Sequence, residues 1–349
     1  MPPERTPPGA VITGCAGLSL SADESRLFAD TDPFGFVLFA RNIDSPGQVR
    51  ALTDAMRAAV GRADAPVLID QEGGRVARLR PPHWRHPPPA ARFGEMARRD
   101  PDAAATAAEL NSQLIAAELR ALGITVDCVP VLDVPGPGMH EVIGDRVYAE
   151  TPGLVARLGR AACDGLLAGG VLPVIKHMPG HGRARTDSHA ELPVVDAPRA
   201  ELEAVDFAPF RALADMPWGM TAHVVYDAID PDQPATTSAA VIEEVIRGWM
   251  GFDGLLLSDD LCMSALSGTP GARARAALEA GCDVALHCNG TFEEMVAVAG
   301  AAGSMSEVAQ TRARRAPVSG DVSAFDVSAF DVAAAQSRLD ELLGATAAG

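Results

Sequence analysis

The sequence is short of positive charge. Among its 349 residues, 29 Lys and Arg stand against 46 Asp and Glu, which gives a formal net charge of −17. Binding to a nucleic-acid backbone requires cations clustered on one face, because the phosphates must be neutralised. This charge balance argues against general nucleic-acid binding and favours a well-hydrated protein.

Signals for membrane insertion and export are also missing. No apolar run reaches the roughly 20 residues that a membrane-spanning helix needs. Residues 12–15 look like a lipoprotein cleavage box, but the residues before them do not supply the apolar stretch of a signal peptide. The six cysteines have no CxxC spacing, so we expect them to be reduced and mostly buried. We therefore predict a cytoplasmic protein with no membrane partner.

Short apolar runs alternate with Ala-rich segments of helical spacing. Eight runs are predicted strands: residues 10–15, 35–39, 66–69, 124–131, 171–175, 218–222, 254–257 and 283–286. The predicted helices between them cover residues 49–60, 104–122, 154–167, 200–214, 239–250 and 272–280. Such alternation implies right-handed crossovers and a parallel sheet, and eight repeats indicate an α/β fold, a closed (β/α)8 TIM barrel. An open doubly wound sheet is disfavoured because no GxGxxG turn follows the first strand.

The chain is predicted to hold a single catalytic barrel over residues 1–310 and a C-terminal tail over residues 311–349. Within the tail the five residues DVSAF occur at 321–325 and again at 326–330, a short duplication to which we assign no role. Residues 334–343 are expected to form a packing helix.

Polar and ionisable side chains follow nearly all of the apolar runs. They are Arg41 and Asn42, then Asp70, Gln71 and Glu72, then Asp133, Lys176 and His177, His223, Asp259 and Asp260, and finally His287. The carboxyl ends of the strands form the face on which barrel enzymes carry their active sites. Clustering on almost every strand therefore predicts a catalytic site at this face.

The segment from residue 171 to residue 189 carries the most unusual chemistry. Its apolar strand is predicted to end at Lys176 and His177, and the Pro and Gly residues beyond them predict an irregular loop up to residue 186. Asp187 precedes His189 by two residues, so in an extended segment its carboxylate can hydrogen-bond one ring nitrogen and raise the basicity of the imidazole. Although a solvated surface pair is the commoner role of such residues, this pair is suited to proton transfer. The loop could close over the barrel mouth and bring His189 to a bound substrate.

Two other strand ends provide carboxylates. Asp70 is followed by a Gly-Gly turn and then by Arg78; a carboxylate accepts two hydrogen bonds from hydroxyls and a guanidinium donates two, so the pair is suited to clamping a sugar. Asp259 emerges directly from an apolar strand, where a carboxylate is costly to desolvate unless it is used or paired. Asp260 is either its partner or a helix cap.

A carboxylate on one side of a substrate and an Asp-supported His on the other is the arrangement needed for retaining glycoside hydrolysis. The carboxylate, here Asp259, attacks the anomeric carbon. The imidazole, here His189, protonates the leaving oxygen and later activates water.

Together these segments resemble the bacterial β-N-acetylglucosaminidases of glycoside hydrolase family three. The matching segments run in the family's order and are Asp70-Gln-Glu-Gly-Gly-Arg75, Gly144-Asp-Arg146, Lys176-His-Met-Pro-Gly-His-Gly182, Asp187-Ser-His189, AHVVYDAID at 222–230 and Ser258-Asp-Asp-Leu261. The resemblance implies Asp259 as the nucleophile and His189 with Asp187 as an acid/base dyad. It also implies that the sugar hydroxyls are held by Asp70, Arg78, Arg146, Lys176 and His177.

The activity implied by the resemblance is hydrolysis, with retention, of a terminal β-linked N-acetylglucosamine. The implied substrates are muropeptides that carry this sugar on anhydro-muramic acid, released during peptidoglycan recycling. We expect no metal and no organic cofactor. We also expect a monomer whose partner is the small sugar or muropeptide substrate.

Three alternatives stay open. The first is a metal-dependent barrel hydrolase, although the Pro and Gly between its first two histidines argue against a helical ligand pair; its candidate ligands are His177, His181, His189, His223 and Asp259. The second is a phosphorylase of the same family, which passes the sugar to phosphate, because a His acid/base does not repel an anion as a carboxylate would. The third is a catalytically silent sugar-binding barrel.

Overall fold

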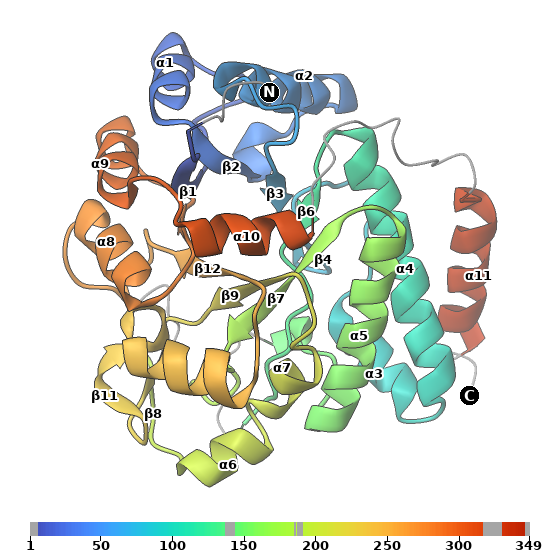
Figure 1. Ribbon diagram of the computed structural model, residues 1–349. Helices are drawn as coiled ribbons and strands as arrows, with labels where there is room; N and C mark the ends of the chain where they lie inside the picture. Colours follow the sequence, from blue (N-terminus) through green and yellow to red (C-terminus); the bar gives the residue numbers. More distant parts are fainter. Residues whose placement is uncertain (1–5, 137–143, 185, 187–190, 317–329, 346–349) are drawn as a thin grey trace.

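Eight parallel strands close into a barrel at the centre of the protein (Figure 1), in the order β1-β13-β12-β9-β7-β6-β3-β2. The computed structural model describes residues 6–136, 144–184, 186, 191–316 and 330–345. The barrel strands are β1 (Gly9–Thr13), β2 (Pro33–Leu38), β3 (Val67–Ile69), β6 (Val126–Asp127), β7 (Leu172–Met178), β9 (Trp218–Thr221), β12 (Leu255–Asp260) and β13 (Val284–His287). Each overlaps one of the eight predicted runs, and the predicted (β/α)8 barrel is confirmed.

Helices surround the barrel and cover the outer face of its strands (Figure 1). The main ones are α1 (Ala22–Thr31), α2 (Pro46–Val60), α4 (Pro101–Ala121), α5 (Pro152–Ala168), η4 (Val241–Trp249, wound as a π-helix), α8 (Pro270–Ala280) and α9 (Phe292–Ala302). Because both faces of each strand are covered, the strands are continuously apolar rather than alternating. All six residues of β2 are buried, for example.

Shorter strands and helices lie in the loops between the barrel elements. The hairpin of β4 (Gln71–Gly73) and β5 (Val76–Ala77) follows β3, and a second small sheet joins β8 (Val194–Val195), β10 (Val225–Tyr226) and β11 (Asp230–Pro234). Short helices in the loops include η1 (Ala40–Asn42), α3 (Ala90–Ala97), η2 (Gly144–Arg146) and η3 (Ala235–Thr237).

The single helix predicted over residues 200–214 is wrong. Two short helices, α6 (Arg199–Ala204) and α7 (Ala208–Ala212), occupy this segment. Pro209 lies in the first turn of α7. A proline has no backbone N–H and its ring clashes with the preceding helical turn, so it begins a helix but does not continue one.

The fifth strand extends one residue beyond the predicted end at Lys176 and His177. Strand β7 continues through Lys176 and His177 to Met178, which pairs with Thr221 of β9. Both polar side chains stay buried within the strand, with 3% and 7% of their surface exposed. Buried polar groups are tolerated where partners satisfy them, and carboxylates supply those partners here.

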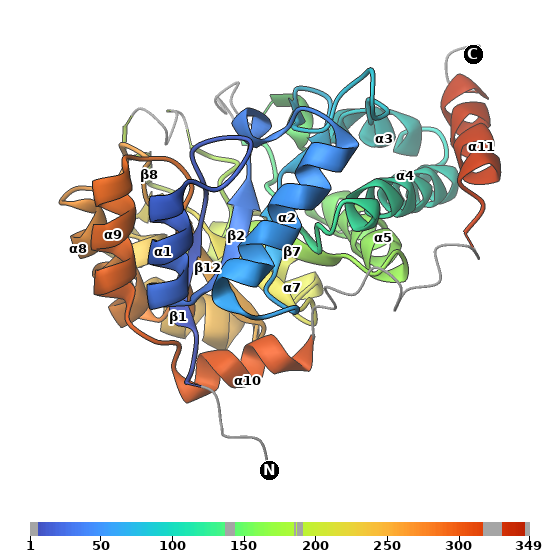
Figure 2. The ribbon, with the colours of Figure 1, turned by 90° about the horizontal axis from the view of Figure 1, so that it is seen from above.

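Helix α10 (Glu307–Arg315) lies at the amino-terminal end of the barrel (Figure 2). Its Arg312 forms ion pairs with Asp253, just before β12, and with Asp283, just before β13. Helix α11 (Val332–Ala345) corresponds to the packing helix predicted at 334–343 and lies beside α4 (Figure 1). Among the described helices, none is both long and apolar enough to cross a membrane.

Candidate active site

A cavity of about 480 Å³ opens at the carboxyl ends of the barrel strands. Six of the residues predicted to act in the site line it: Asp70, Arg78, Arg146, Lys176, His177 and Asp259. They come from loops and strands that are far apart in the sequence. The predicted dyad of Asp187 and His189 lies outside the described residues.

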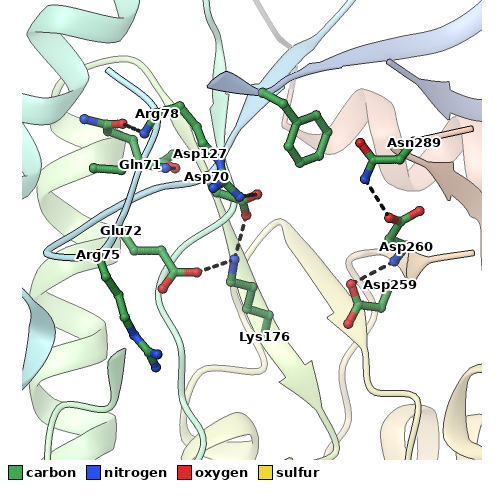
Figure 3. Close-up of polar contacts among 12 residues, drawn as sticks. Asp70, Gln71, Glu72, Arg75, Arg78, Asp127, Lys176, Asp259, Asp260 and Asn289 are labelled. Carbon is green, nitrogen blue, oxygen red and sulfur yellow. Dashed lines mark hydrogen bonds and ion pairs between the residues drawn. The ribbon is translucent and has the colours of Figure 1, made fainter. Parts of the chain in front are cut away.

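One wall of the cavity is built around Lys176 (Figure 3). Its Nζ donates to Oδ1 of Asp70 at 2.8 Å and lies 2.7 Å from Oε1 of Glu72. Oδ2 of Asp70 accepts a second hydrogen bond, at 3.0 Å, from Nη2 of Arg78. The two predicted clamp residues are therefore bound to each other, which holds both side chains in position beside the cavity.

Glu72 is an essential part of this wall, and the sequence analysis assigned it no role. Its carboxylate accepts two hydrogen bonds from Arg146, through Nε and Nη2, each at 2.8 Å. Only 6% of the Glu72 side chain is exposed. The signal that could have identified it is the two-residue spacing from Asp70, because residues i and i+2 of an extended segment point to the same side.

The charges of this wall stabilise one another. Burial by itself would raise the pKa of Glu72, but Arg146 and Lys176 outweigh it and lower that pKa from 4.5 to about 2. Burial likewise opposes the charged form of Asp70, yet Lys176 and Arg78 hold its pKa well below the usual range. Burial would lower the pKa of Lys176, whereas Asp70 and Glu72 raise it. The wall thus presents fixed anions and cations to a ligand.

The opposite side of the cavity carries Asp259, near the end of β12 (Figure 3). Its Oδ1 accepts a hydrogen bond from the backbone N–H of Asp260 at 2.8 Å. Burial would raise the pKa of Asp259, but the nearby His177 and His223 and this hydrogen bond lower it below its ordinary value. The carboxylate is therefore ionised near neutral pH, as a nucleophile must be.

Asp260 supports the backbone around Asp259 rather than capping a helix. Its Oδ1 accepts from the backbone N–H groups of Cys262 and Cys288, both at 3.0 Å. Its Oδ2 accepts from the side-chain amide of Asn289 at 3.3 Å (Figure 3). These bonds tie the loop after β12 to the end of β13. The Asp260 carboxylate is thus neither a helix cap nor a partner of Asp259; only the backbone N–H of Asp260 bonds to Asp259.

His177 is held by a buried carboxylate that the sequence analysis noted only as following a strand. Nδ1 of His177 lies 2.8 Å from Oδ2 of Asp133, whose side chain is fully buried. Oδ1 of Asp133 accepts from the backbone N–H of His181 at 2.7 Å. The contact implies that Nδ1 of His177 carries a proton and donates it in a hydrogen bond to Asp133. Nε2 is then the ring nitrogen of His177 that is available to a ligand in the cavity.

The other histidines play different parts. His181 also lines the cavity, and burial lowers its pKa to about 4, so the ring is neutral near pH 7. His223 is buried, with Nδ1 2.7 Å from Oγ1 of Thr236 and Nε2 3.0 Å from the carbonyl oxygen of Asp260. It is not among the residues that line the cavity.

The metal-dependent alternative requires several of these side chains to converge on one point. Within the described part of the chain, no three His, Cys, Asp or Glu side chains are placed to hold a metal ion. His177 also has one ring nitrogen committed to Asp133. The remaining candidate ligand, His189, lies outside that part, so the metal-dependent alternative is supported by none of the described geometry.

Comparison with known proteins agrees with this geometry. Residues 16–316 match the glycosyl hydrolase family 3 N terminal domain. The chain is 44% identical over 285 residues to a beta-hexosaminidase of Alkalilimnicola ehrlichii, covering 80% of this chain and 81% of that protein. It is 41% identical over 293 residues to a beta-hexosaminidase of Bordetella avium, covering 82% of each.

A solved structure extends the similarity to the fold. NagZ from Neisseria gonorrhoeae, in complex with N-trifluoroacetyl-D-glucosamine, matches with a TM-score of 0.86 and 33% identity, over 97% of this chain and 99% of that one. Sequence and structural similarity extend together over most of the barrel. The chain therefore belongs to glycoside hydrolase family 3.

Proposed function

We propose that this protein is a retaining β-N-acetylglucosaminidase that removes a terminal β-linked N-acetylglucosamine. The observation that carries the proposal is the position of Asp259. Its carboxylate favours the ionised form and faces a cavity whose other wall presents fixed charged groups. The names of the relatives, and the amino sugar bound to the gonococcal NagZ, support an N-acetylhexosamine as the sugar.

In the first step, one oxygen of Asp259 attacks the anomeric carbon and forms a covalent glycosyl ester. His189, held by Asp187, gives its proton to the leaving oxygen as the glycosidic bond breaks. In the second step, the neutral His189 takes a proton from water, which attacks the same carbon and releases the sugar from Asp259. An imidazole with a pKa of roughly 6.5 can serve both steps near neutral pH.

The described residues bind and orient the sugar in this scheme. Arg78, Arg146 and His177 offer donors, and Asp70 and Glu72 offer the carboxylate lone pairs that remain beside their cations. Since these groups already hold one another in place, little side-chain ordering is needed on binding. We further propose that the natural substrates are muropeptides from peptidoglycan recycling, and that the enzyme hydrolyses them in the cytoplasm.

The first test is release of 4-nitrophenol from 4-nitrophenyl β-N-acetylglucosaminide, beside the matching β-glucoside. We expect release from the acetamido sugar alone, with the β-anomer as the first sugar product in NMR spectra. Buffers with chelator and with added phosphate are compared. A requirement for metal would instead support the metal-dependent hydrolase, and sugar 1-phosphate as product would show a phosphorylase.

Two variants test the assigned roles. Asp259→Ala should lower kcat by at least about 10³-fold, because loss of one member of a catalytic unit typically costs on the order of 10⁴-fold or more. His189→Ala should spare the 4-nitrophenyl substrate more than a substrate with a poor leaving group, because a good leaving group needs less protonation. Equal losses on the two substrates would count against His189 as the acid.

A further inference from the structure

Gln71 stands between two carboxylates of the charged wall but plays no part in the reaction proposed above. Asp70 and Glu72 line the candidate active-site cavity, whereas Gln71 is not among its lining residues and is fully buried. Consecutive side chains of an extended segment point to opposite sides. The side chain of Gln71 therefore lies behind the wall, on the same short strand β4 that positions Glu72.

The side-chain amide of Gln71 binds the backbone that leads out of β5. Its Oε1 accepts from the backbone N–H of Arg78 at 2.8 Å (Figure 3) and from that of Leu79 at 3.0 Å. Its Nε2 donates to the carbonyl oxygen of Leu79 at 3.0 Å. These bonds need an acceptor and a donor in one side chain, which an amide supplies.

This amide takes over where the pairing of the hairpin ends. The backbone ladder of β4 and β5 consists of two residue pairs, and its register shifts between them. After β5 the N–H groups of Arg78 and Leu79 bond to the Gln71 side chain instead of to a strand. Leu79 is itself fully buried in an apolar cluster with residues of α2 and α4. The amide therefore fixes the hairpin against the outer layer of the barrel.

Arg78 is consequently held at both ends by adjacent residues of one segment. Its backbone N–H is bound by Gln71 at 2.8 Å, and its guanidinium is bound by Asp70 at 3.0 Å. These contacts close a ring that runs from Asp70 through Gln71 to Arg78 and back. A shift of Gln71 would change how the guanidinium and the Asp70 carboxylate face the cavity.

The backbone of Gln71 is anchored to a neighbouring barrel strand. Its N–H donates to Oδ1 of Asp127 at 2.9 Å, and Asp127 is the fully buried last residue of β6. Strands β3 and β6 pair as far as Ile69 and Asp127, so this side chain extends their contact into the segment that carries the two acids. Burial raises the pKa of Asp127 to about 8, so the carboxyl is mostly protonated at pH 6 and a neutral amide can replace it as the acceptor.

We propose that Gln71 is a positioning residue for the sugar site: anchored by Asp127, it sets the relative placement of the carboxylates and the guanidinium that hold the sugar. The proposal rests on the proposed function, since it takes the wall around Lys176 to bind the sugar. Both acids beside Gln71 contact Lys176, at 2.8 and 2.7 Å, so a rotation of the Gln71 backbone would move both contacts together. The proposed nucleophile is carried by β12 on the opposite side of the cavity, so its attack should be affected less than sugar binding.

The main test is Gln71→Met, which keeps the length of the side chain and removes its hydrogen bonds. With 4-nitrophenyl β-N-acetylglucosaminide we expect KM to rise by about tenfold or more, the effect of losing one hydrogen bond between the sugar and a charged group. The value of kcat should fall by less than about threefold. Calorimetry with N-acetylglucosamine should show a loss of affinity of the same size as the rise in KM. A fall in kcat with unchanged KM and affinity would overturn the positioning role.

Two variants of Asp127 test the anchor, and they decide the question if Gln71→Met does not fold. Asp127→Ala leaves the backbone N–H of Gln71 without its acceptor and should raise KM as Gln71→Met does. Asp127→Asn keeps a carbonyl oxygen at that place and should stay within about twofold of the wild-type KM. Equal KM values in the two variants would overturn the role of the anchor.

The matched control is Thr53→Val, which removes a buried side-chain hydrogen bond away from the cavity. Oγ1 of Thr53, in α2, donates to the carbonyl oxygen of Leu122 at 2.8 Å, and neither residue lines the cavity. Thr53→Val and Gln71→Met should both lower the melting temperature, but only Gln71→Met should raise KM. A rise in KM in both variants would mean that KM follows stability, and the positioning role would be overturned.

The proposed function can fail separately from the role of Gln71. Wild-type turnover with unchanged KM and affinity in Gln71→Met would overturn the positioning role and leave the hydrolase standing. Binding of N-acetylglucosamine without turnover would overturn the hydrolase, and the affinities of the wild type and Gln71→Met would still decide the role of Gln71. A wild-type protein that does not bind N-acetylglucosamine would overturn the positioning role.

Discussion

Lys176 is the only lysine among the 29 Lys and Arg residues of the chain. It sits where a compact ammonium group fits between two carboxylates, at 2.8 Å from Asp70 and 2.7 Å from Glu72, with 3% of its side chain exposed. Arginine has a longer, planar and rigid head group, so it cannot replace lysine in such a closed position without moving its neighbours. The geometry of the site thus explains why position 176 holds a lysine and not an arginine.

Lys176→Arg should therefore behave as a disruptive change. We expect a loss of about 1 to 3 kcal/mol of stability from overpacking, together with at least about a tenfold fall in kcat/KM, since 1.4 kcal/mol of lost transition-state binding corresponds to a factor of ten. Urea denaturation and steady-state kinetics measure the two effects. The control is Arg26→Lys, the opposite exchange at an exposed residue. It should leave the free energy of unfolding and kcat/KM unchanged.

Glu72 gives a prediction about pH. Its pKa is about 2 in the folded protein and 4.5 ordinarily, so its contribution to stability is present above pH 4.5 and is lost as the pH falls towards 2. Glu72→Gln should cost about 3 kcal/mol or more at pH 6, because it removes the buried carboxylate that Arg146 and Lys176 share. The difference in unfolding free energy from the wild type should narrow steadily below pH 4.5.

Urea denaturation between pH 6 and pH 3 measures that difference. Glu95→Gln removes an exposed carboxylate paired with Arg92 and should cost little at any pH. If the difference in unfolding free energy between the wild type and Glu72→Gln stays constant down to pH 3, the Glu72 carboxylate is not held in its charged form.

At the scale of the element, loops are positioned by close backbone contact. Gly94 of α3 faces the carbonyl oxygen of Tyr148, in the segment that carries Arg146. A Cβ at residue 94 would stand 1.7 Å from that oxygen, so any side chain must push the segment away. The helix therefore fixes where Arg146 meets Glu72.

Gly94→Ala should reduce stability by about 1 to 3 kcal/mol through overpacking. It should also lower kcat/KM because Arg146 moves. The matched control is Gly300→Ala, in α9, where an added Cβ would have no atom within 4 Å. It should stabilise the folded protein by up to about 1 kcal/mol, because alanine favours the helix more than glycine does. Thermal melting and the 4-nitrophenyl assay distinguish the two, and a Gly94→Ala protein with wild-type kinetics would refute the positioning role.

Element boundaries show where sequence reasoning succeeds. The eight apolar runs became the eight barrel strands because continuous burial on both faces leaves a strong local pattern. The burial of Lys176 and His177 inside β7 was not visible in the sequence, because only their distant partners Asp70, Glu72 and Asp133 allow these polar residues to stay inside a strand. Pro209 was a visible local signal for the break between α6 and α7.

At the scale of the whole molecule, the last described helix is an added layer on the barrel. Leu339 of α11 is 1% exposed and packs with α3 and α4 residues in one apolar cluster. Figure 1 shows α11 on the outer side of α4. No residue of α11 lines the candidate active-site cavity within the part of the chain described here.

Leu339→Ala should thus separate stability from activity. We expect a loss of about 2 to 5 kcal/mol, the usual cost of truncating a buried leucine, with kcat and KM unchanged well below the melting temperature. Val332→Ala, at a position that is 48% exposed, should change neither. A fall in kcat for Leu339→Ala at low temperature would indicate that the tail helix is coupled to the site.

The sequence by itself determined the barrel, the face that carries the candidate site and six of the residues that line its cavity. These follow from local patterns: apolar runs, helical spacing and polar residues at strand ends. Only the tertiary structure decided that Glu72 links Arg146 to Lys176, that Asp133 supports His177 and that Asp260 ties β12 to β13. Each of these contacts joins residues distant in the chain, so it depends on how the barrel closes, and no local pattern encodes it.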